Sequence, residues 1–311
     1  MRVLLCFLLF SSTINADKID ILANFTLDEL CPGSQIAETT GFDTLSCYMP
    51  FSRYIYSTYS PDVKKIFLMN NFWSVSEVAS LPKKKLVLFI WEPGGVSPTY
   101  CNFFSRVYTY NDNLVDGVKY FKFFYPVLTP MCSDLPTFDQ KRLCVMVAHS
   151  STKERVDMVR FFETKPEDEF EFYGLNPITL SDRYRGGIPG HPLSQTKFEV
   201  MKQFRFCVCF ENSFINGYIT EKIFACFAAG CIPIYLGAPN VEKYIPKECL
   251  IDYRDFRDNE ELYSFIKTMP EEVYERYLSN IRKYLASEKA HLFSSEHFSE
   301  TIKKAALATG R

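Results

Sequence analysis

The sequence predicts an α/β fold in which helices cover parallel sheets. The main observation is an alternation of short apolar runs and helical segments through the second half of the chain, between residues 143 and 253. The second is composition, because 47% of the 311 residues are hydrophobic and 16% are aromatic. A chain of this length and apolar content has room for two domains of about 150 residues, each with its own core.

Strands and helices in the second half follow one another in a regular order. Runs rich in aromatic and aliphatic residues predict buried strands over 143–148, 170–173, 204–209, 232–236 and 250–253. Helices are predicted over 153–163 and 223–230, the second ending at Gly230 as its C-cap. Residues 260–307 predict three more helices, which form a C-terminal tail.

The first half shows a similar but sparser pattern. Apolar runs predict strands over 84–91, 107–110 and 120–125, and a helix is predicted near 74–80. We expect a first domain over residues 17–135 and a second domain, with the helical tail, over residues 136–311.

The N-terminus resembles a signal peptide. Arg2 precedes an apolar run over 3–10, and small or polar residues follow as far as a cleavage site after Ala16. This predicts a secretory or membrane-associated protein, in the Golgi if the cell is eukaryotic. The alternative is an ordinary first strand, which 18–22 could also supply, in a cytoplasmic protein. A lone glycosylation sequon at 24–26 is compatible with secretion, and no apolar stretch reaches the roughly 18 residues of a membrane-spanning helix.

Charge and cysteine content exclude other classes of protein. The net charge of −2 argues against a nucleic-acid partner. Of the 11 cysteines, those inside apolar runs are predicted to be small buried core residues, namely Cys144, Cys207, Cys209, Cys226 and Cys231. No C-x-x-C pair occurs, so a zinc site is not expected, whereas the redox compartment stays open.

The segment 204–230 carries the clearest functional pattern. An apolar strand leads into the polar turn Glu211-Asn212-Ser213, and a helix begins shortly after Tyr218. The N-terminus of a helix in this position offers free N–H groups and a positive dipole end to an anion above the sheet. With a ring at Tyr218, a hydroxyl acceptor at Glu221 and a cation at Lys222, the pattern predicts a nucleotide site. Helix capping alone could also explain these polar residues.

This segment resembles the signature of glycosyltransferase family 10, the α1,3/α1,4-fucosyltransferases. The motif is carried by Phe210-Glu211-Asn212-Ser213 and Tyr218-Ile219-Thr220-Glu221-Lys222 and continues through Gly230 to Ile232-Pro233-Ile234 and the residues up to 256. The similarity covers about fifty consecutive residues.

The resemblance implies a GT-B fold, with two Rossmann-like domains that face each other across a cleft. It implies transfer of L-fucose from GDP-β-L-fucose, with inversion, to a hydroxyl of a glycan acceptor, most simply in α1,3 linkage. Donor-binding residues would be Glu211, Asn212, Tyr218, Glu221 and Lys222. The alternatives are a related GT-B transferase that uses another nucleotide sugar, and a sugar-nucleotide-binding protein without catalysis.

Two further roles fall outside the signature. The resemblance places the general base in the first domain, after a hydrophobic strand. Here the strand before Trp91 runs into Glu92, whose carboxylate would be partly desolvated and so more basic. The alternative is that Glu92 is an exposed turn residue. The resemblance also implies an arginine that binds the departing diphosphate, shortly after the strand that opens the second domain. Arg155 is the candidate at this position, with Lys153 as its rival. No Asp-x-Asp motif occurs, so no obligatory metal cofactor is expected.

Overall fold

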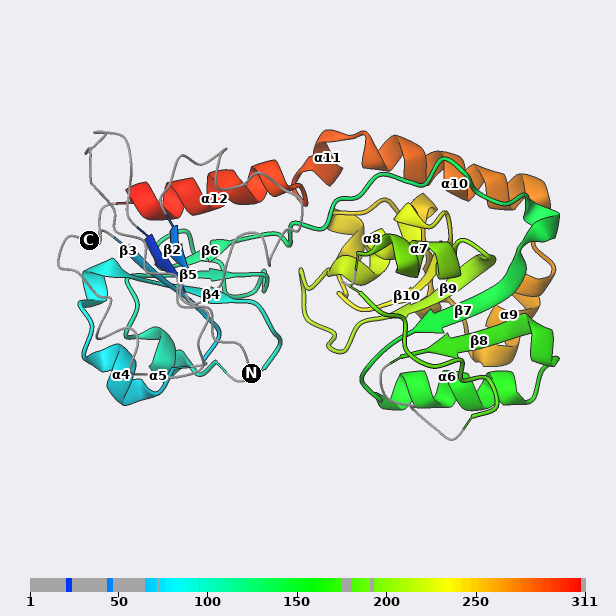
Figure 1. Cartoon of the computed structure of the whole chain (residues 1–311), viewed down its shortest axis with the longest axis horizontal. Helices are drawn as coiled ribbons and strands as arrows, with labels where there is room; N and C mark the ends of the chain where they lie inside the picture. Colours follow the sequence, from blue (N-terminus) through cyan, green and yellow to red (C-terminus); the bar gives the residue numbers. More distant parts are fainter. Residues whose placement is uncertain are drawn as a thin grey trace, which may run out of the picture.

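The computed structural model describes residues 21–23, 44–46, 65–71, 73–94, 96–174, 181–190 and 193–308. Within them the chain forms two parallel sheets, one from each half of the sequence, each with helices on its faces (Figure 1). The proposed signal segment and the sequon lie outside the described residues. No helix in the described part of the chain has the length and apolarity needed to cross a bilayer.

The first sheet has the strand order β2-β1-β3-β4-β5-β6, and every neighbouring pair is parallel. Its strands are β1 (Ile21–Ala23), β2 (Thr44–Ser46), β3 (Lys65–Met69), β4 (Leu86–Ile90), β5 (Arg106–Thr109) and β6 (Tyr120–Lys122). Two short helices, α4 (Val75–Ala79) and α5 (Pro98–Cys101), lie on one face (Figure 1). The strands predicted near 84–91, 107–110 and 120–125 are therefore confirmed, and β1 overlaps the strand suggested as an alternative at 18–22.

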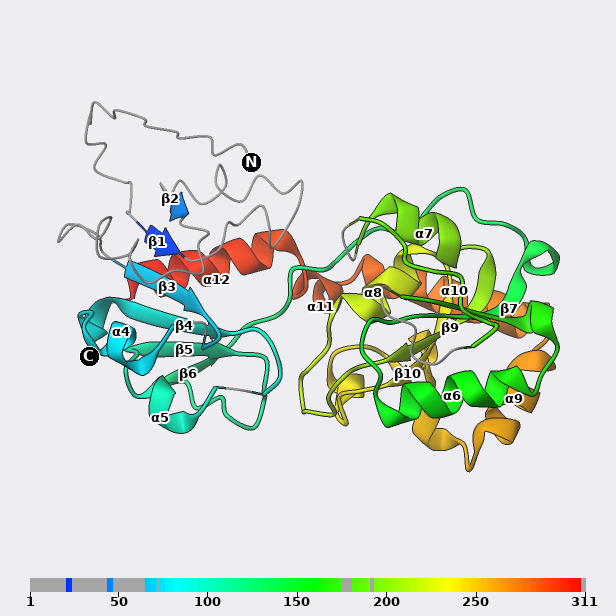
Figure 2. The same ribbon diagram turned by 60° about the horizontal axis from the view of Figure 1, so that its bottom comes forward.

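The second sheet has the order β11-β10-β9-β7-β8 and is also parallel throughout. Its strands are β7 (Arg142–Val147), β8 (Phe170–Tyr173), β9 (Phe204–Phe210), β10 (Ile232–Leu236) and β11 (Ile251–Asp252). One face is covered by α6 (Lys153–Glu163), and the other by α7 (Gln195–Met201), α8 (Glu221–Ala228) and the tail helix α10 (Figures 1 and 2). All five strands and both helices predicted for this half are confirmed.

The C-terminal tail contains four helices where three were predicted. They are α9 (Asn259–Lys267), α10 (Glu271–Leu285), α11 (Glu288–His291) and α12 (Ser295–Leu307). The difference is α11, a single turn whose N-cap Ser287 accepts a hydrogen bond from the Ala290 N–H. A break this short leaves little trace in the apolar periodicity of the sequence.

Helix α12 returns to the first sheet (Figure 2). Its Phe298 ring lies 6.0 Å from the ring of Phe89 and 5.9 Å from that of Trp91, on β4 and just after it. The connection is reinforced where the Val127 and Leu128 N–H groups both donate to the carbonyl of Phe293. The boundary near residue 135 stays a prediction. The chain crosses between the two sheets twice, and helix α12 packs with the first domain because its apolar side chains fill the core of that domain.

The five cysteines predicted to be core residues, Cys144, Cys207, Cys209, Cys226 and Cys231, are buried free thiols. Three of them lie on β7 and β9, in the middle of the second sheet. Desolvation raises the pKa of the Cys231 thiol to about 12, which is typical of an unreactive core residue.

Candidate active site between the domains

A cavity of about 360 Å³ lies where the two domains meet. The first domain contributes the segment after β4 and a residue after β6, whereas the second contributes the segments after β7 and β9, the start of α7 and the start of α8. Its polar and aromatic lining includes Trp91, Glu92, Tyr125, His149, Ser150, Arg155, Ser194, Lys197, Asn212, Tyr218, Thr220, Glu221 and Lys222. The structure therefore brings together every predicted site residue except Glu211.

Glu211 lies beneath the cavity and is fully buried. Its carboxylate accepts hydrogen bonds from the Thr220 N–H at 3.0 Å and the Thr220 hydroxyl at 2.9 Å, and it pairs with the Lys222 ammonium at 2.9 Å. Its oxygens contact the start of α8, and it is not a lining residue of the cavity, so the structure places it where it can orient Lys222. Direct binding of the donor by Glu211 stays a prediction.

Lys222 projects into the cavity from the first turn of α8. The N-cap Thr220 accepts a hydrogen bond from the Lys222 N–H, and this fixes the backbone from which the ammonium extends. Burial alone would lower the pKa of Lys222, but the carboxylates of Glu211 and Glu221 outweigh it and raise the pKa above its usual value. The raised pKa favours the charged ammonium, which lines the cavity beside Glu221, whose Oε1 lies 3.5 Å away.

Arg155 is 2% exposed, yet it reaches the cavity wall. Its Nη1 donates to the Ser150 carbonyl at 2.9 Å and to the Ser150 hydroxyl, and its Nη2 donates to the carbonyl of Phe210. The guanidinium thus connects the ends of β7 and β9. The rival candidate Lys153 pairs with Asp157 in solvent and is not a lining residue, so the geometry favours Arg155.

Glu92 lies in a bend just after β4 and is exposed, as the alternative prediction had it, but it also lines the cavity opposite the second domain. Asn70 fixes its backbone, because the side-chain oxygen of Asn70 accepts the N–H groups of Trp91 at 2.7 Å and Glu92 at 3.0 Å. Asn70 has a φ of +51°, a left-handed conformation that asparagine tolerates. Desolvation raises the pKa of the Glu92 carboxyl, and the positive charge of Lys222 across the cavity opposes this rise only in part.

Tyr218 forms part of the wall between the two domains. Its ring lies 4.7 Å from that of Tyr110 and 6.0 Å from that of Tyr125, both in the first domain. The Tyr125 hydroxyl donates to the carbonyl of Trp91, next to Glu92. The aromatic contacts therefore connect the signature loop directly to the segment that carries the candidate base.

Lys197 is a site residue that the sequence analysis missed. It lies on α7, a helix that was not predicted, behind the N-cap Ser194. The residue is buried and lines the cavity. Burial alone would raise the pKa of Glu221, but the charges of Lys222 and Lys197 contribute to lowering it. The available signal was Ser194 followed by a short amphipathic run, which the preceding glycine- and proline-rich loop obscured.

Residues 139–306 match the family model for the C-terminal part of glycosyltransferase family 10 (fucosyltransferase). The chain belongs to this family. The match covers α8 and its flanking strands, so it includes the signature and also Arg155 and Lys197. Glu92, in contrast, lies outside the matched region.

Individual relatives agree with this family assignment. The chain is 30% identical over 131 residues to an alpha-(1,3)-fucosyltransferase, FucT, of Helicobacter pylori, a match that covers 40% of this chain and 27% of that protein. It is 39% identical over 72 residues to a GDP-fucose protein O-fucosyltransferase 3 of Xenopus tropicalis, covering 22% of this chain and 15% of the relative. The matched part is therefore less than a third of either relative.

The fold is similar to that of a solved relative over almost the whole chain. A crystal structure of an alpha1,3-fucosyltransferase with GDP-fucose superposes with a TM-score of 0.59 at 15% identity, covering 97% of this chain and 94% of that chain. This likeness, at low identity, concerns the fold alone. It confirms the predicted GT-B architecture of this family 10 protein.

Proposed function

We propose that the protein is a fucosyltransferase that moves L-fucose from GDP-β-L-fucose to an acceptor hydroxyl with inversion at the sugar carbon. The observation that carries the proposal is a cavity that is lined both by a carboxylate of one domain, Glu92, and by the cations Arg155 and Lys222 of the other. A glycosyl transfer needs these two groups on opposite sides of the reacting carbon.

The second domain would hold the donor. Lys222 and Arg155 offer positive charge to the diphosphate, and the N-terminus of α8 adds its dipole. Glu221 can accept hydrogen bonds from ribose or sugar hydroxyls because its lowered pKa keeps it ionised. Asn212 and Tyr218 would complete the pocket around the nucleotide, and Lys197 provides a third cation within the same wall.

The first domain would supply the base. As the bond between the fucose carbon and the phosphate oxygen breaks, its electron pair stays on the diphosphate, which the cations stabilise. The acceptor oxygen bonds to the same carbon from the opposite face, and its proton passes to the Glu92 carboxylate. The raised pKa of the Glu92 carboxyl makes its carboxylate a stronger base than a glutamate with the usual pKa.

Binding of a panel of GDP- and UDP-sugars tests the donor assignment. We expect GDP-fucose to bind and GDP to compete, followed by release of GDP when an acceptor is added. Binding of a UDP-sugar without binding of GDP would favour a related transferase with another donor. Tight GDP-fucose binding without transfer to any acceptor would instead indicate a protein that binds the sugar nucleotide without catalysis.

The acceptor is proposed to be a glycan hydroxyl, with an α1,3 linkage by analogy with the H. pylori relative. A second acceptor class follows from the O-fucosyltransferase relative, whose name specifies a protein acceptor. Incubation with oligosaccharides and with unglycosylated protein substrates, followed by mass spectrometry of the products, separates the two. For location, we propose the secretory pathway, which fusion of residues 1–16 to a reporter would test.

A further inference from the structure

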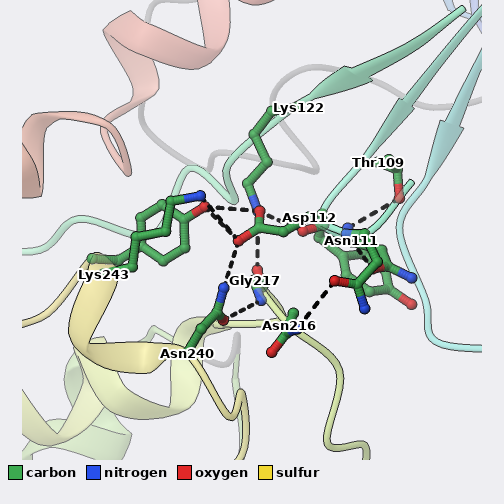
Figure 3. A network of polar contacts seen from close by, with 11 residues as sticks. Thr109, Asn111, Asp112, Lys122, Asn216, Gly217, Asn240 and Lys243 are labelled. Carbon is green, nitrogen blue, oxygen red and sulfur yellow. Dashed lines mark hydrogen bonds and ion pairs between the residues drawn. The ribbon is translucent and has the colours of Figure 1, made fainter. Parts of the chain in front are cut away.

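A second polar cluster joins the domains outside the cavity, and its centre is Asp112 (Figure 3). Asp112 lies in the loop between β5 and β6, and its side chain is 12% exposed. The Lys122 ammonium, at the end of β6, donates to its Oδ1 at 2.7 Å. Burial alone would raise the pKa of Asp112, but the hydrogen bonds from Lys122 and Tyr244 outweigh this, so the pKa is lowered and the carboxylate is ionised.

The remaining partners of this carboxylate come from the second domain. The hydroxyl of Tyr244 donates at 2.7 Å, the side-chain amide of Asn240 donates at 2.7 Å, and the Lys243 ammonium lies 3.5 Å from Oδ2. All three partners follow β10 and are more than a hundred residues away in sequence. One partly buried carboxylate is thus shared by both domains, and we call Asp112, Lys122, Asn240, Lys243 and Tyr244 the Asp112 cluster.

The cluster also holds the loop that precedes Tyr218 (Figure 3). The Asp112 N–H donates to the carbonyl of Asn216 at 3.0 Å, and Lys122 donates to the carbonyl of Gly217 at 3.3 Å. The Gly217 N–H in turn donates to the side chain of Asn240 at 2.8 Å. The backbone immediately before Tyr218 is therefore bound on both sides by groups of the cluster.

Gly217 shows how closely the two domains approach here. Its φ is +81°, and a Cβ atom at this position would lie 2.4 Å from the Lys122 ammonium and 2.5 Å from the carbonyl oxygen of Tyr110. A side chain would push the first domain away from the signature loop. A glycine at this position, between the two halves of the signature, therefore permits the close contact with the first domain.

We propose that Asp112 is a positioning residue that holds the first domain against the signature loop at the separation at which Glu92 faces Lys222. The contacts run without a break from Asp112 to the cavity. Gly217 is followed by the cavity-lining residue Tyr218, and the Tyr218 ring packs on that of Tyr110, two residues before Asp112. Asp112 touches no ligand site itself and is not a cavity-lining residue. Its effect on turnover, unlike its effect on domain arrangement, rests on the proposed function.

The test is Asp112→Asn, which keeps the shape of the side chain but leaves the partly buried Lys122 ammonium without its counter-charge. We expect the radius of gyration from small-angle X-ray scattering to increase, because the domains separate more often. We expect kcat for transfer from GDP-fucose to fall about tenfold to a hundredfold, since small displacements of reacting groups cost that much. The dissociation constant of GDP should change less than kcat, because most proposed donor contacts lie within the second domain.

Tyr244→Phe is the second variant, because it removes one hydrogen bond from the opposite domain and preserves packing. It should show the same changes in scattering and kcat to a smaller degree. Tyr244→Phe therefore still tests the proposal if Asp112→Asn does not fold. Asp139→Asn, an exposed aspartate after the domain connection, is the matched control and should behave as wild type.

Lower thermal stability with wild-type scattering and wild-type kcat in both variants would overturn the proposal, because it would show a purely structural role. If the wild-type protein transfers no fucose at all, the proposed function fails, but the scattering comparison still decides whether Asp112 holds the domains together.

Discussion

The fully buried carboxylate of Glu211 lies 2.9 Å from the ammonium of Lys222, at the floor of the interdomain cavity. Thr220 also donates to this carboxylate through both its N–H and its hydroxyl, so the first turn of α8 is anchored at one point. These contacts explain why an acidic residue follows β9 in a site that is proposed to bind an anion. The Glu211 carboxylate orients Lys222 and raises its pKa, whereas the Lys222 ammonium is the group that lines the cavity.

Lys222→Met should affect both binding and stability. Loss of a charge-assisted contact should weaken GDP binding by roughly 1.5–3 kcal/mol, measured by titration calorimetry. Because Glu211 would be left buried without a counter-ion, the free energy of unfolding should also fall by about 3–5 kcal/mol in denaturant titrations. Lys303→Met, on an exposed position of α12, is the control. Unchanged GDP affinity in the folded variant would show that Lys222 serves only to stabilise the start of α8.

Glu92→Gln should abolish transfer and leave GDP affinity near wild type. The amide keeps the side-chain shape but cannot accept a proton, and a general base contributes about 10²–10⁴-fold to the rate. Initial rates of GDP release and GDP titrations measure the two effects, with Glu163→Gln on α6 as the control. Near-normal turnover would assign the base to another carboxylate, whereas lost nucleotide binding would place Glu92 in the donor site.

The pH dependence of kcat/KM should reveal the environment of Glu92. A general base acts when deprotonated, so activity should fall as the pH drops through its pKa, and the raised pKa moves this acidic limb above the usual glutamate value of 4.5. Lys222 opposes the rise, so residual activity of Lys222→Met should show the limb at still higher pH. His149→Gln is a necessary comparison, since His149 also lines the cavity. A limb that disappears in His149→Gln would assign the titration to the imidazole.

Gly217→Ala should destabilise the protein by more than about 1 kcal/mol, because a positive φ is combined with a steric conflict. Gly186→Ala is a matched control, since Gly186 has a φ of +91° and open space around the position of a Cβ atom. Chemical denaturation of both variants separates backbone strain from the clash with Lys122 and Tyr110. An equal decrease in the free energy of unfolding of the two variants would argue against close contact between the domains at Gly217.

Transfer activity should survive EDTA, because the proposed leaving-group charge is balanced by Arg155, Lys222 and the dipole of α8 rather than by a divalent cation. The measurement is GDP release from GDP-fucose after exhaustive chelation. Loss of activity that added manganese restores would establish a metal requirement and overturn this prediction.

Much of the second domain could be predicted from the sequence because local patterns determine it. The apolar runs that become β7 to β10 are visible in the order of residues alone, as is the motif from Phe210 to Lys222. The predicted cap of α8 was one residue off, because the C-cap is Ala229 and Gly230 follows it with a φ of +60°. The place of Arg155 also follows, because it lies in the first turn of the helix after β7, and the carboxyl ends of parallel strands share one edge of the sheet. The secondary structure of this half and most of its candidate site are thus local properties.

The tertiary structure decided what depends on distant contacts. Glu211 belongs to a polar signature in sequence, but its burial beneath α8 turns it into the partner of Lys222. Lys197 enters the site only because α7 packs beside α8, and α12 joins the first domain because Phe298 fits its aromatic core. The contact of Asp112 with Tyr244 likewise joins residues 132 positions apart. Sequence periodicity records which face of an element is apolar, but not which distant element will cover it.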